Sequence, residues 1–399
     1  MGTKIRVCMI AYGFHAPWFD GCMVTLRRLL AAISPFAEVL VVTIAKNDSM
    51  SDIGNVYYIR APRIFQDIRV RKDTFVLVDE LADVVRVIRL VVLLCRREGI
   101  DILHIHNVSR QGFYAVMLRS IMNLPLLIHV YTEKDIHSSS IRVRFNTLLD
   151  CMALNKAKPD GYVCTSSYLA GSMRALGFPS DRVSVVPPPV DCNRFKPADQ
   201  QRLRGSYGIN SDEFVVAYIG RATPSRGVSC LVKAVAKVVN ESQIPIKLLL
   251  CPPKIPAEDK YFKEIMRLVE QCQLSGSTIV LGKSDKVEEL YNLADLVAIP
   301  FTKMAAVDPP LTLLESMACG TPVVGSALGG IPDVIRDGES GFLVKPGDVS
   351  ELAVTIGRLA RAGGASKEIR KKARETILKH YSAAISSKML VDLYQKMVT

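Results

Sequence analysis

Short apolar runs alternate with helix-like segments along nearly the whole chain, and this alternation restricts the possible folds more than any other feature. In the first half the apolar runs lie at residues 4–11, 39–44, 100–105, 125–130 and 161–164. Runs of this kind are typical of buried strands, and the segments between them have a helical pattern. The alternation predicts an α/β fold in which helices cover both faces of a parallel sheet.

A second series of the same kind follows a polar, proline-bearing stretch at residues 187–213. Its expected strands lie at residues 214–219, 246–250, 278–281, 296–300 and 322–325. The chain therefore predicts two doubly wound, Rossmann-like domains, joined near residues 190–212. Ligands of such sheets bind outside the carboxyl ends of the strands, and with two facing domains we expect the site in the cleft between them.

Composition and charge narrow the class of protein. Apolar residues make up 49% of the 399 residues and charged residues 23%, which excludes disorder as the main state. The formal net charge of +12 divides into +7 over residues 1–190 and +5 over the remainder. Because this excess is spread out and no nucleic-acid-binding module is visible, we expect anionic small molecules or an anionic membrane face as partners, and no nucleic acid.

The cysteines and the apolar stretches indicate a cytoplasmic protein. The ten cysteines stand singly, mostly inside apolar runs, which predicts buried thiols in a reducing compartment. The basic start, residues 1–6, precedes a strand-like run without a cleavage site, so we expect no signal peptide. The most apolar stretch, residues 84–95, contains Arg86 and Arg89 and is shorter than the roughly 20 residues of a spanning helix. We interpret it as a helix of the soluble fold, and the alternative is a helix face that lies on a bilayer at the cytosolic side.

Residues 309–325 carry the most informative pattern for a binding site. Two prolines precede an expected helix, Gly320 ends it, and a strand follows. The helix N-terminus, at Leu311 and Thr312, therefore points out of a strand-to-helix loop, where free amides favour an anion. Glu315 lies one turn further in, and its carboxylate is able to accept two hydrogen bonds from a vicinal diol such as that of ribose. The alternative is a solvated glutamate on an amphipathic helix.

A second loop, residues 220–227, has two arginines between an expected strand and helix. Arg221 and Arg226 at the carboxyl edge of a sheet are able to bracket a diphosphate with charge-assisted hydrogen bonds. Two solvated surface arginines are the alternative. A third, glycine-rich segment contains Gly329 and Gly330, which would let the backbone approach a ligand closely.

The first half offers weaker candidates. His104 and His106 share one face of an expected strand, and His106 falls near the carboxyl end of that strand. We interpret His104 as structural and consider a functional role for His106. Gly21 lies at a strand-to-helix turn.

Together these segments resemble the retaining glycosyltransferases of family 4, which have the GT-B fold. Four blocks occur in the family's order, at residues 220–227, 281–295, 314–324 and 329–333. The resemblance covers nearly the whole chain but is looser in the first half, where a single Gly21 stands in place of the usual paired glycines. With this resemblance, Gly21 is a candidate for admitting the donor diphosphate, and we consider an acceptor-side role for His106.

The resemblance implies a role for each domain. An acceptor-side domain would comprise residues 1–190, with a terminal helix at 381–399 that packs back on it. A domain for the nucleotide sugar would comprise residues 191–380, with UDP or GDP as the nucleotide.

The same resemblance implies specific donor contacts. Arg221 and Arg226 would bind the diphosphate and act in catalysis, Leu311 and Thr312 would lie at the donor, and Glu315 would bind the ribose. No metal and no cofactor are implied, because arginines and a helix N-terminus neutralise the leaving diphosphate.

Two departures from the family pattern concern the donor sugar. The first acid of the family's Glu-x7-Glu motif falls on Val307, so we consider Asp308 beside it as the sugar contact. Tyr131 stands where the family frequently has histidine.

The function expected from these features is retaining transfer of a sugar from a nucleotide-sugar donor to an acceptor hydroxyl. The acceptor is not identified by the sequence, and lipid-linked and glycan acceptors both fit. Basic residues around Phe65 (Arg63, Arg69, Arg71 and Lys72) suit a lipid phosphate or a membrane surface, or else form a solvated loop. The alternative functions are a catalytically weak GT-B protein that serves as a regulatory or partner subunit and, third, a sugar phosphorylase.

Overall fold

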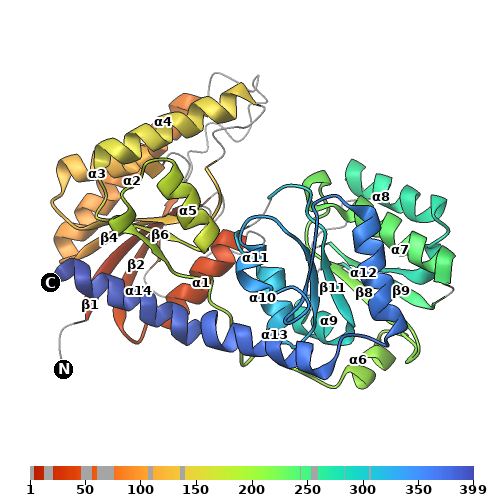
Figure 1. The fold of residues 1–399 in the computed structure, drawn as a ribbon. Helices are drawn as coiled ribbons and strands as arrows, with labels where there is room; N and C mark the ends of the chain where they lie inside the picture. The colour runs from red at the N-terminus through yellow and green to blue at the C-terminus, as the bar shows by residue number, and fades with distance from the viewer. Residues whose placement is uncertain are drawn as a thin grey trace. The chain divides into compact units, whose positions relative to one another are not determined.

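The computed structural model describes residues 4–12, 21–45, 56–60, 76–106, 111–134, 140–242, 244–252, 259–282, 284–304 and 307–399. The chain divides into two compact units. The first unit comprises Met1–Pro187 together with Ser386–Thr399, and the second comprises Pro188–Ile385. Figure 1 shows the helices and strands of both units.

The first unit is built on a seven-stranded sheet in which all neighbouring strands are parallel. Its strands are β1 (Ile5–Tyr12), β2 (Ala37–Ala45), β3 (Val56–Arg60), β4 (Ile102–His106), β5 (Leu126–Val130), β6 (Gly161–Cys164) and β7 (Val183–Val185). They follow the order β3-β2-β1-β4-β5-β6-β7 across the sheet. The helices of this unit are α1 (Gly21–Ile33), α2 (Val76–Glu98), α3 (Gln111–Ile121), α4 (Ile141–Ala157), α5 (Ser167–Ala175) and most of α14 (Ala383–Val398).

The second unit is built on a six-stranded parallel sheet. Its strands are β8 (Phe214–Ile219), β9 (Ile246–Cys251), β10 (Thr278–Val280), β11 (Leu296–Ile299), β12 (Val323–Ser326) and β13 (Phe342–Val344). The order across the sheet is β10-β9-β8-β11-β12-β13. Its helices are α6 (Gln200–Ser206), α7 (Val228–Ser242), α8 (Lys260–Gln271), α9 (Val287–Leu293), α10 (Leu311–Ala318), α11 (Ile331–Val334), α12 (Val349–Arg361) and α13 (Lys367–His380). A short 3-10 turn, η3 (Pro224–Arg226), precedes α7.

The two sheets share one winding order, which confirms the predicted pair of Rossmann-like, doubly wound folds. In each sheet the strands run outward from the first strand in one direction and then in the other. The order therefore reverses between β1 and β4 in the first unit and between β8 and β11 in the second. Ligands of doubly wound sheets bind at the carboxyl ends of the strands at such a reversal. In the second unit, a ligand site is therefore expected at the edge of the sheet where β8 and β11 end.

All ten predicted strands are present, with ends that differ by at most two residues from those expected. Three further strands, β3, β7 and β13, were not predicted from the sequence. Each is three to five residues long and lies at an edge of its sheet. An edge strand has fewer neighbours and needs less apolar sequence, so these segments lack the long apolar runs that marked the others.

The apolar stretch at residues 84–95 forms part of α2, as predicted. Val91 and Ile88 are buried in the core of the first unit, whereas Val85 on the same helix is 49% exposed. Within the described residues, no helix combines the length and the apolar character needed to cross a bilayer. The basic residues around Phe65 lie outside the described residues.

Candidate active site

The loop that follows β8 is held in a fixed shape at the edge of the second sheet. Gly220 has a φ of +144°, a conformation that side-chain-bearing residues rarely adopt, and its N–H donates to the carbonyl of Cys251 at 3.1 Å. The Tyr218 hydroxyl donates to the carbonyl of Arg221 at 2.6 Å. The backbone of the predicted diphosphate loop is therefore anchored at its start, while the side chain of Arg221 is exposed.

Arg226 lies over the end of β8. Its Nη1 atom is so close to Gly220 that a Cβ added there would lie 3.3 Å away, and its Cζ atom lies 5.3 Å from the centre of the Phe301 ring. Burial raises the pKa of Tyr218, and the charge of Arg226 opposes that rise. The half-buried guanidinium of Arg226 is thus placed at the carboxyl edge of the sheet, with the face of Phe301 as one of its contacts.

The loop after β11 closes around the same segment. The amides of Thr302 and Lys303 both donate to the carbonyl of Ser225, at 2.9 and 3.2 Å. Gly227 has a φ of +65°, and a Cβ there would lie 1.8 Å from the carbonyl oxygen of Pro300. Only glycine satisfies both conditions. Hydrogen bonds therefore join the two loops at the strand-order reversal, and Arg226 lies on the first of them, next to the residue that accepts these bonds.

Helix α10 approaches this edge from the neighbouring loop. Thr312, in its first turn, donates from Oγ1 to the carbonyl of Ile219 at 3.2 Å. Ile219 is the last residue of β8 and directly precedes Gly220. Arg226 and the N-terminal turn of α10 therefore contact adjacent residues at the carboxyl end of one strand. The half-buried Leu311 begins the helix.

Glu315 lies one turn into α10 and is only 7% exposed. The hydroxyl of Tyr291, in α9, donates to its Oε2 atom at 2.6 Å. Tyr291 is fully buried, and burial, with the adjacent Glu315 carboxylate, raises the pKa of its hydroxyl well above the ordinary value. The tyrosine stays protonated and so remains a hydrogen-bond donor that orients the carboxylate. Tyr291 belongs to the block at residues 281–295 that resembles the family, but no local pattern predicted its contact with Glu315 or that of Phe301 with Arg226, because these partners come from distant segments.

Asp308 lies beside the glycine-rich segment. It is 1% exposed, and its Oδ1 atom accepts from the amide of Gly330 at 2.7 Å. Gly329 has a φ of +55°, and a Cβ there would lie 2.9 Å from the same oxygen. Asp308 thus holds the turn between β12 and α11. Its expected contact with the donor sugar stays a prediction.

The candidates of the first unit have different surroundings. His106 is fully buried at the end of β4, with its Nδ1 atom 2.7 Å from the Tyr131 hydroxyl. Burial, with His104 and His129 nearby, lowers its pKa well below the ordinary value, so the ring is neutral. Gly21 is the first residue of α1, and its carbonyl accepts from the Thr25 hydroxyl at 2.8 Å. The acceptor-side role of His106 and the donor role of Gly21 stay predictions.

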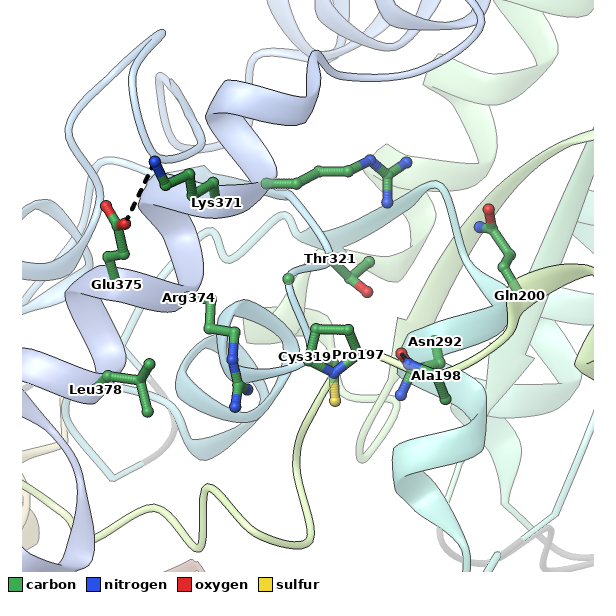
Figure 2. A pocket seen from close by; sticks show the side chains of 12 residues that line it. Pro197, Ala198, Gln200, Asn292, Cys319, Thr321, Lys371, Arg374, Glu375 and Leu378 are labelled. Atoms are coloured by element: carbon green, nitrogen blue, oxygen red, sulfur yellow. Dashed lines mark hydrogen bonds and ion pairs between the residues drawn. The ribbon is translucent and has the colours of Figure 1, made fainter.

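A cavity of about 440 Å³ opens at the opposite edge of the second sheet. Figure 2 shows residues of α13 on one side of it, with Thr321 and Asn292 on the other. Thr321 precedes β12 and Asn292 precedes β11, so the cavity lies at the amino ends of the strands. Arg374 within it donates to the carbonyls of Phe195 and Ala318. None of the predicted donor residues lines this cavity.

Two family models match the chain in succession. The model for glycosyltransferase family 4 matches residues 38–194, and the model for glycosyl transferases group 1 matches residues 199–376. They divide the chain close to the boundary between the two units.

Curated proteins that are named as a glycosyltransferase or as a synthase are similar to this chain in sequence. The N-acetyl-alpha-D-glucosaminyl L-malate synthase of Bacillus anthracis is 27% identical over 75% of this chain and 74% of its own length. The D-inositol 3-phosphate glycosyltransferase of Mycobacterium sp. strain JLS is 33% identical over 46% of this chain, and the match spans only 41% of that protein.

Solved structures share the fold over nearly the whole chain. The Anabaena protein HepE in complex with UDP and glucose has a TM-score of 0.79 and 18% identity, and covers 98% of this chain and 100% of its own. Sucrose-phosphate synthase from Thermosynechococcus elongatus has a TM-score of 0.81 and 20% identity, and covers 98% of this chain and 99% of its own.

The two models together span most of the chain, and curated enzymes of this kind are similar to it in sequence. The predicted resemblance is therefore confirmed, and the chain belongs to glycosyltransferase family 4.

Proposed function

We propose that this enzyme transfers a sugar from a nucleoside-diphosphate sugar to an acceptor hydroxyl, with retention of the anomeric configuration and without a metal ion. The observation that carries the proposal is the meeting of Arg226 and the first turn of α10 at the carboxyl end of β8. A cation and free helix amides at the strand-order reversal suit a diphosphate. UDP is the first nucleotide to test, because HepE structures contain UDP and UDP-glucose.

Each residue has a stated part in this proposal. Arg221 and Arg226 hold the diphosphate, together with the amides at Leu311 and Thr312. Glu315, oriented by Tyr291, accepts hydrogen bonds from the ribose hydroxyls.

Retention follows from attack on the face that the leaving group departs from. The bond between the anomeric carbon and the diphosphate oxygen breaks while the acceptor oxygen bonds to that carbon. The acceptor proton moves to the departing phosphate oxygen. Catalysis then comes from positioning the reactants and from stabilising the negative charge that grows on the diphosphate, for which the two arginines are placed.

We assign the acceptor to the lipid-linked class because of the surface of α4. Ile141, Phe145, Leu148 and Met152 follow one another at helical spacing, and they are 81%, 60%, 46% and 68% exposed. The exposed Arg144 and Lys156 lie on the same helix. An exposed apolar stripe with basic residues suits the surface of an anionic bilayer.

Binding of the donor is tested first. The melting temperature is measured with UDP, GDP, ADP and their sugars. One nucleotide is expected to raise it more than the others do, since a ligand that binds the folded state stabilises that state. Arg226→Ala is expected to remove that shift, and Arg361→Ala, an exposed arginine at the end of α12, to keep it.

Catalysis is tested with the donor so identified. The wild-type protein is expected to hydrolyse the nucleotide sugar slowly. Arg221→Ala is expected to lower that rate about 10²–10³-fold without changing the melting temperature. This result would support the proposed catalytic function. Binding without any hydrolysis or transfer supports the regulatory alternative. The metal-free route predicts equal rates when Mg²⁺ or Mn²⁺ is added to chelator-treated enzyme.

A further inference from the structure

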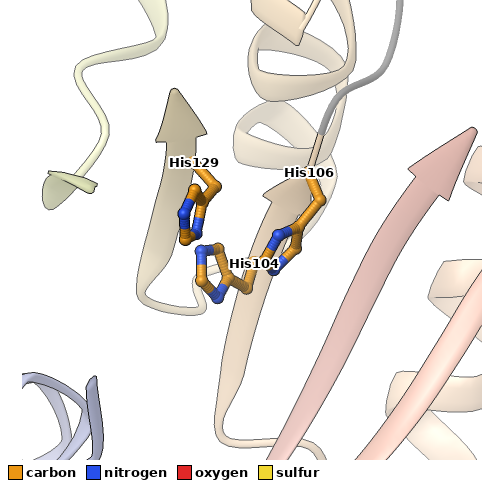
Figure 3. Close-up of side chains that lie close together, drawn as sticks. All are labelled: His104, His106 and His129. Atoms are coloured by element: carbon orange, nitrogen blue, oxygen red, sulfur yellow. The ribbon is translucent and has the colours of Figure 1, made fainter. Parts of the chain in front are cut away.

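The interior of the first unit holds three histidines on one face of two neighbouring strands. His104 and His106 lie two residues apart on β4, and His129 on β5 is the register partner of His106. Residues in these positions project from the same face of a parallel sheet. Figure 3 shows the three rings gathered beside the two strands. One ring nitrogen from each histidine lies within 4.8 Å of those of the other two.

The three rings contain four buried nitrogens that have no hydrogen-bond partner. Each side chain is at most 1% exposed. The unpartnered atoms are Nε2 of His104, Nε2 of His106 and both ring nitrogens of His129. Buried polar atoms are nearly always paired, and a group of unpaired ones commonly marks a bound ion or a functional site. Plain core packing gives no reason for four such atoms at one place.

Two tyrosine hydroxyls orient the rings. Nδ1 of His104 lies 2.7 Å from the Tyr394 hydroxyl, and Nδ1 of His106 lies 2.7 Å from the Tyr131 hydroxyl. When Nδ1–H donates to the tyrosine oxygen, the lone pair of the ring is on Nε2, the atom without a partner. Histidines that bind metals commonly have this arrangement, in which an oxygen accepts from the second ring nitrogen.

We propose that His104, His106 and His129 form a binding site for one divalent transition-metal ion, with Zn²⁺ as the first candidate. Neutral imidazole nitrogens suit Zn²⁺ and Co²⁺, and hydroxide or water completes a four-coordinate site. At a Zn–N distance of 2.0–2.1 Å, nitrogens on a tetrahedral ion lie about 3.3 Å apart. The ring centres lie 3.9–5.3 Å apart, with His129 stacked on the other two rings and His104 tilted against His106, and the rings would turn to converge on the ion.

The ion would tie β4 to β5 inside the first unit. Arg221, Arg226 and the first turn of α10, which are proposed to hold the donor diphosphate, lie in the second unit, and Gly21 of the first unit is not among the three histidines. The inference therefore does not depend on the proposed function, and it leaves the metal-free route of transfer unchanged.

The test uses the full chain without a histidine tag, treated with chelator and then equilibrated with Co²⁺ or Zn²⁺. Since the site is buried, a second sample is refolded from denaturant in the presence of the ion. We expect one Co²⁺ per chain with the strong visible absorption of four-coordinate cobalt, and a rise of the melting temperature with Zn²⁺. Absence of this cobalt spectrum from both samples would overturn the proposal.

His129→Phe is the decisive variant, because neither nitrogen of His129 has a partner to lose. Its metal-free melting temperature is expected to equal or exceed that of wild type, with the cobalt spectrum and the Zn²⁺-dependent rise both lost. Retention of the spectrum in this variant rejects the site. His380→Gln changes an exposed histidine of the second unit and is expected to behave as wild type. If His129→Phe does not fold, His129→Leu replaces it.

The Tyr394→Phe variant distinguishes a metal-binding role of His104 from a purely structural one. Removal of the hydroxyl that orients His104 is expected to weaken Co²⁺ binding about 10–100-fold. An unchanged cobalt affinity in Tyr394→Phe contradicts the assigned role of Nε2 of His104.

Discussion

The hydrogen bond from Tyr291 to Glu315 joins two buried side chains at the proposed ribose site. Removing the hydroxyl leaves the carboxylate without this donor, and a hydrogen bond to a charged group contributes about 1.5–3 kcal/mol. We therefore expect Tyr291→Phe to lower the free energy of unfolding by that amount in urea titrations, and to weaken nucleotide binding.

Tyr261 provides the matched control. Its hydroxyl is buried and has no hydrogen-bond partner, so Tyr261→Phe is expected to leave stability unchanged or slightly raised. Equal losses in the two variants would show that the Tyr291 hydrogen bond contributes nothing specific.

Gly227 combines a left-handed conformation with a close backbone contact, and the two effects can be separated. Gly208 has nearly the same φ, +66°, but nothing lies within 4 Å of an added Cβ. Gly208→Ala is expected to cost about 1 kcal/mol from the conformation alone. Gly227→Ala is expected to cost about 1–3 kcal/mol more, because its Cβ would overlap the Pro300 carbonyl. Denaturant titrations of both variants measure the difference, and equal costs would contradict the contact.

At this scale the sequence identified candidates but not their partners. Arg226 and Glu315 were predicted as donor-binding candidates because three features agreed: their residue types, the glycines and prolines that bound their loops, and the family resemblance. The contact of Arg226 with Phe301 depends on how two loops meet after the sheet has formed, which no local pattern encodes. The role of Asp308 at Gly330 was invisible for the same reason.

Helix α4 carries exposed apolar side chains along its outer face. Its N-terminus is capped by the Ser140 side chain, and Gly112 lets α3 approach its backbone closely. The outward stripe contributes little to packing, so replacing Phe145 and Met152 together with serine is expected to leave the melting temperature within a few degrees.

The same double variant is expected to reduce co-sedimentation with anionic vesicles at least about 10-fold, since each apolar side chain withdrawn from water contributes roughly 1.5–3 kcal/mol. Val354→Ser, which changes a 64% exposed residue of α12, serves as control and is expected to bind as wild type. Vesicle binding that is unaffected by the α4 variant would remove α4 from the membrane contact.

Elements were predictable where burial left a strong pattern. The central strands of both sheets are nearly continuous apolar runs, and their positions were predicted to within two residues. In the polar stretch at 187–213, α6 was not predicted, because it is held by contacts with other segments. Arg204 within it pairs with the buried Asp295, 91 residues further along the chain.

Across the whole molecule, buried thiols are expected to make the free energy of unfolding fall as the pH rises above about 9. Burial raises the pKa of Cys164, Cys251 and Cys319 from about 9 to about 12. Between these values the folded chain keeps the thiol protons while the unfolded chain loses them, so stability falls as pH rises. In that window each thiol lowers the free energy of unfolding by about 1.4 kcal/mol per pH unit, and below the window it causes no such loss.

Urea titrations under reducing conditions at pH 8, 9 and 10 measure this dependence. A Cys251→Ala variant is expected to show a smaller loss of stability per pH unit than wild type. Identical slopes in the two proteins would contradict the assignment to this thiol.

The sequence predicted the two-unit architecture because the alternation of strands and helices occurs twice with a polar break between. It did not reveal the histidine cluster as a unit. His104 and His106 share a strand, but only the pairing of β4 with β5 brings His129 beside them.

The first unit is completed by residues from far along the chain, since Tyr394 beside His104 belongs to α14. On the ribosome, residues up to Pro187 emerge first, and the 198 residues of Pro188–Ile385 must be translated before Ser386–Thr399 appears. Until then the nascent first unit lacks the packing that Leu390 and Tyr394 supply. A stop codon placed after Ile385 would therefore damage the half of the protein that is synthesised first.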